Sequence, residues 1–170
     1  GTLAPSSPKS FLTTKCPATG TISTAVGSGY FGPMLKWAGY DHLIVTGQAP
    51  RPVYLTIVDG EVKLHDASDL WGRDLVETTD ELHRRYGGQC SVLAIGPAGE
   101  RKVKIGLILT DKCPTLGRSN AANLGSKNLK AIVVQGSQGV KICHRKRFDG
   151  IVARLREEAM KDPLRDKWIE

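Results

Sequence analysis

The sequence predicts an α+β fold made of short strands and short helices. The chain has 170 residues, of which 40% are hydrophobic and 24% are charged. That length and composition suit one domain that buries its core without disulfide bonds. Most apolar residues fall in short runs bounded by glycine, proline or Asp-Gly, which is typical of strands. Helical spacing appears in three stretches of the chain, so neither helices nor strands dominate.

In the first half of the chain the predicted elements are brief. In order, they are strands at 11–14 and 21–25, a helix at 30–38, and strands at 43–45, 53–58 and 62–64. A Pro-Ala-Thr-Gly turn separates the first two strands. Gly39 ends the helix, and Asp59-Gly60 predicts a hairpin turn before the last strand.

In the second half, three predicted strands lie between two predicted helices. In order, the sequence predicts a helix at 79–86, strands at 92–95, 103–109 and 128–134, and a helix at 146–160. Asp80 and Glu81 suit the positive end of the first of these helices, which Gly87 and Gly88 end. A Gly-Pro-Ala-Gly turn at 96–99 separates two of the strands. Residues 118–125 form a short polar segment.

The net charge of +7 comes from 24 basic and 17 acidic residues. Such a balance suits an anionic ligand, a nucleic acid or an acidic partner. Part of the excess is one run at 141–147, which we interpret as a solvated face at the start of a helix. No RNA-binding aromatic signature or zinc-finger spacing accompanies it, so we expect no nucleic-acid partner.

Other classes are excluded by what the sequence lacks. No apolar run approaches the ~20 residues of a membrane span, and the first residues resemble no signal peptide. We therefore expect a cytoplasmic protein with no membrane partner. The four cysteines are Cys16, Cys90, Cys113 and Cys143. No two form a C-x-x-C pair, so neither a metal site within the chain nor a disulfide framework is predicted.

The first candidate binding loop spans residues 25–32 and holds Gly27, Gly29 and Gly32. Glycines this dense allow backbone N–H groups to approach an anion closely. The loop is no phosphate-binding Walker sequence and no dinucleotide fingerprint. An ordinary turn is the alternative interpretation.

The second candidate loop spans residues 116–130 and combines Arg118, two lysines, several amides and small residues. It could bind phosphate through backbone N–H groups and a guanidinium fork, or be a capped turn before a strand. Lys9, between a proline and a strand, could face a ligand or only solvent.

Ordinary catalysis finds little support in the sequence. The four histidines are scattered, no serine lies in a G-x-S-x-G elbow, and no carboxylates show a paired spacing. We predict no catalytic residue in this chain and assign its tryptophans to packing.

Several ordered motifs carry a resemblance to a known family. They are Gly1-Thr2-x-Ala4-Pro5, Thr14-Lys15-x-Pro17-x-Thr19-Gly20, Gly29-Tyr30-Phe31-Gly32-x-x-Leu35-Lys36-x-Ala38-Gly39-Tyr40-Asp41, Pro52-Val53-Tyr54, Asp66-Ala67-Ser68-x-Leu70-Trp71-Gly72, Ile95-Gly96-Pro97-Ala98-Gly99-Glu100 and Gly125-Ser126-Lys127-Asn128-Leu129-Lys130-Ala131-Ile132. Their order and spacing resemble the aldehyde ferredoxin oxidoreductase family of tungsten- or molybdenum-pterin enzymes.

The resemblance implies a two-sheet base domain that cradles a bis-pterin metal cofactor. Residues 1–136 would form that domain without its first strands, and 137–170 would be a connecting helix toward absent helical domains. Those domains would supply the cysteines of a [4Fe–4S] cluster and the acid–base residues. Because strands would be missing, an apolar face or sheet edge is expected to be uncovered, so the chain alone should aggregate or need a partner.

The family reaction is the oxidation of an aldehyde to a carboxylic acid, with ferredoxin as electron acceptor. This implies an anaerobic, oligomeric enzyme whose partners are its remaining domains or subunits and a ferredoxin or iron–sulfur subunit. Contact with the pterin is implied for Lys9, Val26, Ser28, Gly29, Thr115, Gly117 and Arg118. The backbone carbonyls of Val26 and Thr115 would hold a Mg²⁺ that bridges the phosphates.

This sequence also departs from the family pattern. Lys9 stands where the family has Arg, so the bidentate fork of a guanidinium group is absent. Val26 replaces Asn. In the second loop Pro114 replaces an Arg, while Ser119 and Asn120 replace paired glycines. Side chains larger than glycine can block close backbone approach. The alternative is therefore a scaffold subunit of a related redox complex that has lost the cofactor.

Overall fold

The computed structural model describes residues 2, 4–113 and 115–162, and it confirms the predicted α+β class. The strands are β1 (Lys9–Lys15), β2 (Ile22–Ser28), β3 (Val53–Val58), β4 (Glu61–Asp66), β5 (Ser91–Ile95), β6 (Leu107–Thr110), β7 (Thr115–Arg118) and β8 (Leu129–Gln135). The helices are α1 (Phe31–Trp37), α2 (Leu75–Tyr86), α3 (Pro97–Glu100), α4 (Ala121–Gly125) and α5 (Arg145–Met160). Of the sequence features named above, Gly1, Pro114 and residues 163–170 lie outside this description.

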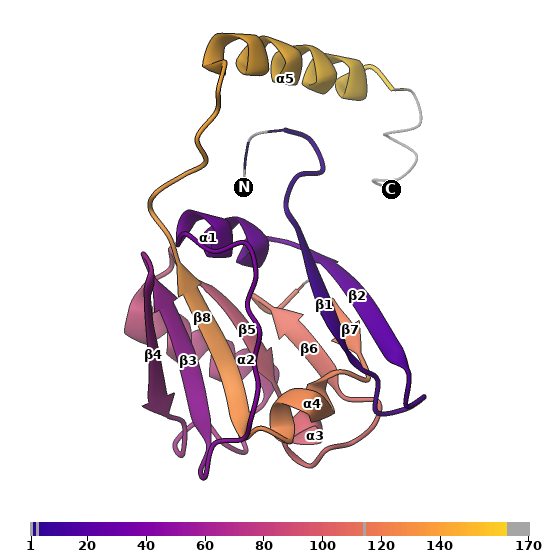
Figure 1. Cartoon of the computed structure of the whole chain (residues 1–170), viewed down its shortest axis with the longest axis vertical. Helices are drawn as coiled ribbons and strands as arrows, with labels where there is room; N and C mark the ends of the chain where they lie inside the picture. The colour runs from indigo at the N-terminus through magenta and orange to yellow at the C-terminus, as the bar shows by residue number, and fades with distance from the viewer. Residues whose placement is uncertain (1, 3, 114, 163–170) are drawn as a thin grey trace.

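The strands form two sheets, as Figure 1 shows. One is the antiparallel hairpin β1-β2, in which Lys9 faces Ser28 and Lys15 faces Ile22. The other has six strands in the order β4-β3-β8-β5-β6-β7. Within it β3 and β8 are parallel, and the other neighbours are antiparallel. The hairpin lies beside β7, at one end of the larger sheet.

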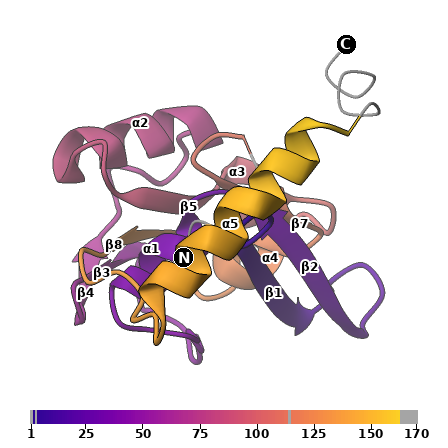
Figure 2. The same cartoon turned by 90° about the horizontal axis from the view of Figure 1, so that it is seen from above.

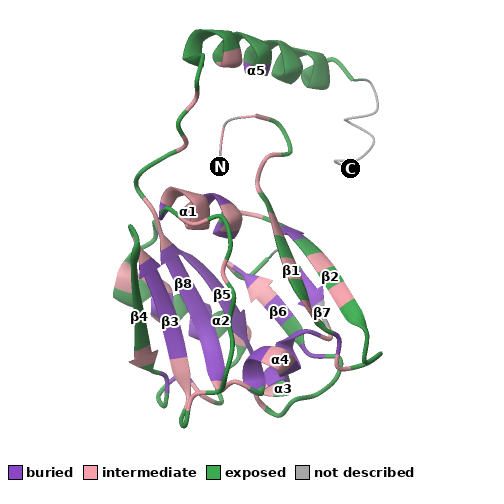
Figure 3. Ribbon diagram, viewed as in Figure 1, coloured by how far each residue is buried: buried purple, intermediate pink, exposed green. Residues whose placement is uncertain are grey.

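Both faces of the six-stranded sheet are buried at its centre (Figure 3). On one face, side chains such as Leu93 and Ile132 pack with α1 and α4. On the other, Val92 and Val133 pack with Leu82 of α2. Neighbouring residues of a strand point to opposite faces, so a strand covered on both sides becomes a continuous apolar run. This explains the hydrophobic stretches at 92–95 in β5 and 131–134 in β8.

Two predicted strands differ from the structure. Residues 43–45 are irregular, because this segment crosses the sheet face without pairing with a strand. Leu43 packs against the core, whereas Ile44 is exposed, so the segment covers the sheet without joining its hydrogen-bonded ladder. The strand expected at 103–109 is shorter, because turns occupy 101–105 and β6 begins only at Leu107.

The helix expected at 79–86 begins earlier, at Leu75. Asp74 accepts a hydrogen bond from the Glu77 N–H at 2.8 Å, and the Glu77 side chain accepts one from the Asp74 N–H. This capping box fixes the helix start four residues before Thr79. The expected turn at 96–99 is the short helix α3, and the polar stretch at 118–125 contains α4.

The helix predicted at 146–160 is confirmed as α5, which begins one residue earlier. Figure 1 shows α5 standing apart from both sheets, after the irregular residues that follow β8, and Figure 2 shows the same helix from above. Val152 is its buried side chain, whereas Ile151 and Leu155 are about two-fifths exposed. Among the described residues, no helix is long and apolar enough to cross a membrane.

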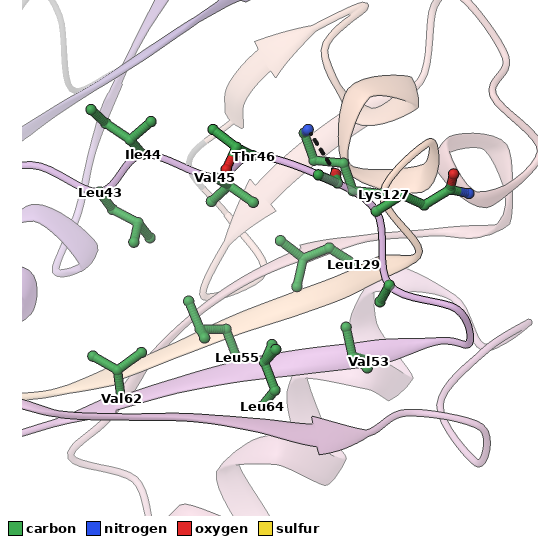
Figure 4. A pocket seen from close by; sticks show the side chains of 13 residues that line it. Leu43, Ile44, Val45, Thr46, Val53, Leu55, Val62, Leu64, Lys127 and Leu129 are labelled. Carbon is green, nitrogen blue, oxygen red and sulfur yellow. Dashed lines mark hydrogen bonds between the residues drawn. The ribbon is translucent and has the colours of Figure 1, made fainter.

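An apolar groove lies between the irregular segment 43–49 and strands β3, β4 and β8 (Figure 4). Its volume is about 640 Å³, and its walls are mainly aliphatic. Ile44 is 85% exposed and Leu64 is 64% exposed. The uncovered apolar surface expected from the sequence is therefore present at this edge of the sheet.

A buried ion pair ties three elements together. The Lys130 side chain, on β8, is fully buried, and its Nζ donates to Glu100 Oε1 at 2.5 Å and to the Arg73 carbonyl at 2.7 Å. Both Glu100 oxygens accept from the Gly72 N–H at 3.0 Å. Burial lowers the pKa of Lys130, and the hydrogen bond to Glu100 opposes this. The end of α3 is thereby fixed to β8 and to the segment that precedes α2.

We predict that this pair is costly to break on one side only. Lys130→Met leaves Glu100 buried without its counter-charge and should cost about 3–5 kcal/mol of unfolding free energy. Adding Glu100→Gln should recover part of that loss, because the amide oxygen still accepts from Gly72. Urea unfolding of the two single variants and the double variant measures this coupling. Additive effects in this cycle would show that the two charges do not depend on each other.

We also predict that the apolar groove drives self-association of the isolated chain. Val62, in the groove, and Val76, on α2, are each 48% exposed. Val62→Lys should lower hydrophobic-dye binding and aggregate content, whereas Val76→Lys should leave both near wild type. Dye fluorescence and sedimentation velocity provide the measurement. A clean wild-type monomer with a cooperative melt and no dye binding would contradict the prediction.

Candidate functional site

The two candidate loops, far apart in sequence, meet where β2 packs against β7. A Cβ atom placed on Gly27 would lie 2.9 Å from Leu116 Cδ1 and 3.1 Å from the Thr115 carbonyl oxygen. One placed on Gly117 would lie 3.1 Å from the Ala25 Cβ atom. All three distances are shorter than ordinary Cβ contacts, so glycine at these two positions lets the strands approach closely without a shift of their neighbours.

The outward face of the hairpin carries a cation and a hydroxyl side by side. Lys9 and Ser28 face each other across the hairpin, and Lys9 Nζ donates to Ser28 Oγ at 2.8 Å. Phe11 and Val26, the next outward pair, are 70% and 52% exposed. An ammonium group next to an apolar patch offers contacts for a ligand that has both an anionic and a flat apolar part.

The start of α1 closes this end of the hairpin. Gly29 adopts φ +106°, a conformation that favours glycine, and leads the chain from β2 into α1. Gly32 packs against β1, because a Cβ atom there would lie 2.9 Å from the Lys9 carbonyl oxygen. The first loop is thus positioned by the hairpin below it and by α1 above it.

The remaining predicted site residues extend along β7. Thr115 is exposed, and its carbonyl lies beside Gly27, next to Val26. Gly117 is buried with φ +124°, and it lies farther along β2, beside Ala25. Arg118 ends β7, and its side chain lies outside the description. Lys9, Val26, Ser28, Gly29 and Thr115 are therefore brought to one end of the hairpin, while Gly117 and Arg118 lie farther along it.

The donors present here fit an anionic group such as a phosphate. Lys9 supplies a positive charge and Ser28 a hydroxyl. Asn120 is fully buried, and its Nδ2 has no hydrogen-bond partner among the described residues. This Nδ2 lies against Gly117, 2.8 Å from where a Cβ atom would be. Within the described part of the chain, no three His, Cys, Asp or Glu side chains are grouped to hold a metal ion.

Sequence reasoning missed the contacts that join the second loop to the hairpin. In the sequence, Asn120 stands out only as a replacement for glycine. In the structure, Thr14 Oγ1 donates to Asn120 Oδ1 at 2.9 Å. Hydrogen bonds from Thr19 lower the pKa of the nearby Cys16 thiol, and Ser119 adds a smaller effect. The signal available in the sequence was a pair of asparagines, Asn120 and Asn123, in a loop otherwise rich in small residues.

A second polar cluster lies at the far side of the sheet. His83 Nδ1 is 3.5 Å from Cys90 Sγ, and His83 Nε2 is 3.5 Å from Asp111 Oδ1. Burial, with a contribution from Asp111, raises the pKa of Cys90 to about 11. The thiol donates to the Gly87 carbonyl at 3.1 Å. A buried, protonated thiol is a poor nucleophile, so this arrangement is structural.

Comparisons with known proteins give a consistent set of relatives. A family model described as aldehyde ferredoxin oxidoreductase, N-terminal domain, matches residues 1–136. The tungsten-containing aldehyde ferredoxin oxidoreductases of Pyrococcus furiosus and Thermococcus kodakarensis are each 40% identical over 166 residues, which is 96% of this chain and 27% of theirs. The aliphatic sulfonate oxidoreductase, WOR-like subunit, of Pyrococcus furiosus is 31% identical over 95% of this chain and 26% of its own length.

Among solved structures, the active site complex BamBC of benzoyl coenzyme A reductase, in complex with 1,5 dienoyl-CoA, has a similar fold. The TM-score is 0.89 and the identity 29%, over 97% of this chain and 26% of that one. The chain therefore spans about a quarter of the length of the relatives it matches. The 40% identical relatives are named as enzymes, and the chain corresponds to one domain of them.

We predict that Gly27→Ala will destabilise the chain through the β2–β7 contact. The added methyl group must displace Leu116 or the Thr115 carbonyl, and overpacking of this kind costs about 1–3 kcal/mol. Gly88→Ala is the matched control, because nothing lies within 4 Å of its Cβ position. Urea-unfolding midpoints at low protein concentration would compare the two. Equal midpoints would show that β2 and β7 are not in close contact.

Proposed function

Because the chain belongs to the aldehyde ferredoxin oxidoreductase family, we propose that it is the cofactor-cradling domain of a tungsten- or molybdenum-pterin oxidoreductase. The enzyme would oxidise aldehydes, or related carbonyl substrates, to carboxylic acids and pass the electrons to ferredoxin. The observation that carries this proposal is the meeting of the two loops beside the Lys9–Ser28 pair. The family contains tungsten enzymes, and this end of the hairpin offers donors for a phosphate-bearing cofactor.

The metal–pterin group, when bound, supplies the two-electron oxidation, and the protein positions it. In this proposal Lys9 and Ser28 bind a pterin phosphate, since a cation and a hydroxyl both suit phosphate oxygens. Gly29 allows the first loop to follow the phosphate closely. Farther along β7, Gly117 and Arg118 contact the cofactor.

The backbone carbonyls of Val26 and Thr115 would hold a Mg²⁺ between the phosphates. Backbone carbonyls are hard oxygen ligands, which suit Mg²⁺. The exposed Val26 side chain does not prevent this role, because the ligand atom belongs to the backbone. The position of the Thr115 carbonyl beside Gly27, which follows Val26 on β2, supports this pairing.

Residues 1–136 would be the base domain and 137–170 a connection toward helical domains of the enzyme. The separation of α5 from both sheets supports this division. The other domains or subunits would provide the [4Fe–4S] cluster and the acid–base groups, since no catalytic residue is assigned here. The proposal includes ferredoxin or an iron–sulfur subunit as the redox partner. It also includes an oligomeric assembly, an anaerobic host and a cytoplasmic location.

A cofactor-free scaffold subunit is the second candidate. The departures in the second loop favour it, because Ser119 and Asn120 occupy places where the family has glycines. Ser119 adopts φ +70°, a conformation costly for a residue with a side chain. The likeness to a WOR-like subunit and to BamBC fits a subunit of a larger redox complex equally well.

The deciding experiment is elemental analysis for W, Mo and Fe, with pterin release, on the native protein and all chains that co-purify with it. Stoichiometric tungsten or molybdenum with pterin is the expected result. Lys9→Met should lower the pterin content several-fold, because the phosphate loses its cation. Lys15→Met, at the other end of β1 on the same exposed face, is the matched control. Protein without metal or pterin, purified anaerobically from metal-replete cells, would favour the scaffold.

A further inference from the structure

Two asparagines of the second loop hold one threonine of the hairpin. Thr14 Oγ1 donates to Asn120 Oδ1 at 2.9 Å and accepts from Asn123 Nδ2 at 3.1 Å. Asn123 Nδ2 also donates to the Lys15 carbonyl at 3.0 Å. One hydroxyl therefore uses both its donor and its acceptor capacity on residues more than 100 positions later in the chain. We call Thr14, Asn120 and Asn123 the amide clamp.

The amide clamp fixes β7 from its C-terminal side. Asn120 follows β7 and precedes α4, and it is fully buried. Its Nδ2 lies against Gly117, and Gly117 lies against Ala25 of β2. Starting from Thr14, each contact therefore places the next segment of β7 along the hairpin, as far as the Thr115 carbonyl beside Gly27.

The buried amide is retained despite a cost. A buried donor without a partner costs about 1–3 kcal/mol, and Asn120 Nδ2 has none among the described residues. An aliphatic side chain would fill the same space without that penalty. The Asn120 amide instead supplies the oxygen that accepts the hydrogen bond from Thr14. This bond fixes one register between the second loop and the hairpin.

We propose that the amide clamp is a positioning device for the candidate cofactor site. It holds the Thr115 carbonyl at a fixed separation from the Val26 carbonyl, the two groups expected to share the phosphate-bridging Mg²⁺. Thr14, Asn120 and Asn123 are positioning residues that touch the second loop rather than the cofactor. This inference rests on the proposed function for its ligand, while the clamp itself is a property of the chain.

Thr13 provides a matched control for Thr14. The two are neighbours on β1, but Thr13 faces outward, and its hydroxyl pairs across the hairpin with Thr24 Oγ1 at 2.9 Å. Thr14→Val removes the hydroxyl of the clamp, and Thr13→Val removes a hydroxyl whose partner among the described residues lies on β2. Thr14→Ser keeps the hydroxyl. Asn123→Ala, at a less buried position, breaks the clamp from the other side.

The first readout is hydrogen exchange of the backbone amides at 115–120. We expect exchange at least tenfold faster in Thr14→Val and Asn123→Ala, wild-type exchange in Thr13→Val, and recovery in Thr14→Ser. A tenfold change corresponds to about 1.4 kcal/mol, in the range of one to two hydrogen bonds. Unchanged exchange in Thr14→Val, or an equal effect of Thr13→Val, would overturn the clamp.

The second readout is retention of pterin during dialysis against EDTA, measured on the protein with its co-purifying chains and well below each variant's melting temperature. Thr14→Val should lose pterin about tenfold faster than wild type, and Thr14→Ser should not. Loosened amides with unchanged pterin retention would overturn the positioning role. Wild-type protein without pterin would overturn the proposed function instead, and hydrogen exchange alone would then decide whether the clamp fixes the second loop.

Discussion

The close contact between β2 and β7 is the constraint on which the candidate site depends. Gly27 lies against Leu116 and the Thr115 carbonyl, and Gly117 lies against Ala25. A side chain at either glycine would force its neighbours to shift, and Gly117 also adopts φ +124°, a conformation that favours glycine. A two-stranded hairpin is marginal in water by itself, so its packing against the larger sheet also stabilises it. The same contact that completes the fold therefore brings the two loops together.

The six-stranded sheet supplies the rigid support for that contact. Its central strands are covered on both faces, which fixes β5, β6 and β8 and therefore the place where β7 begins. The buried Lys130–Glu100 pair secures α3. This helix packs against α4, which lies within the second loop and follows β7. The edge strand β4 and the groove beside it are less protected. Rigidity is thus concentrated on the side of the sheet that carries the loops.

The groups at the hairpin differ from those on the other side of the sheet. At the hairpin they are a cation, hydroxyls, glycine-rich backbone and amides, and their proposed role is to hold or position an anion. Away from the loops, His83 lies near both the buried Cys90 and Asp111, and His83 and Asp111 are partly exposed. A cradle of this kind suits a cofactor that carries its own chemistry.

The fold class, most strands and the last helix could be predicted from the sequence, because periodicity and turn residues are local properties. The second candidate loop is not a loop throughout, because residues 116–130 contain most of β7, all of α4 and the start of β8. Residues 43–45 have the composition of a strand, but no strand lies beside them to pair with. The start of α2 was predicted too late although its signal is local, since Asp74 and Glu77 are three residues apart and form a capping box. Only the tertiary structure joined Thr14 to Asn120 and Gly27 to Thr115, because contacts between residues about 90 to 110 positions apart arise from the packing of the hairpin on the sheet and leave no period in the sequence.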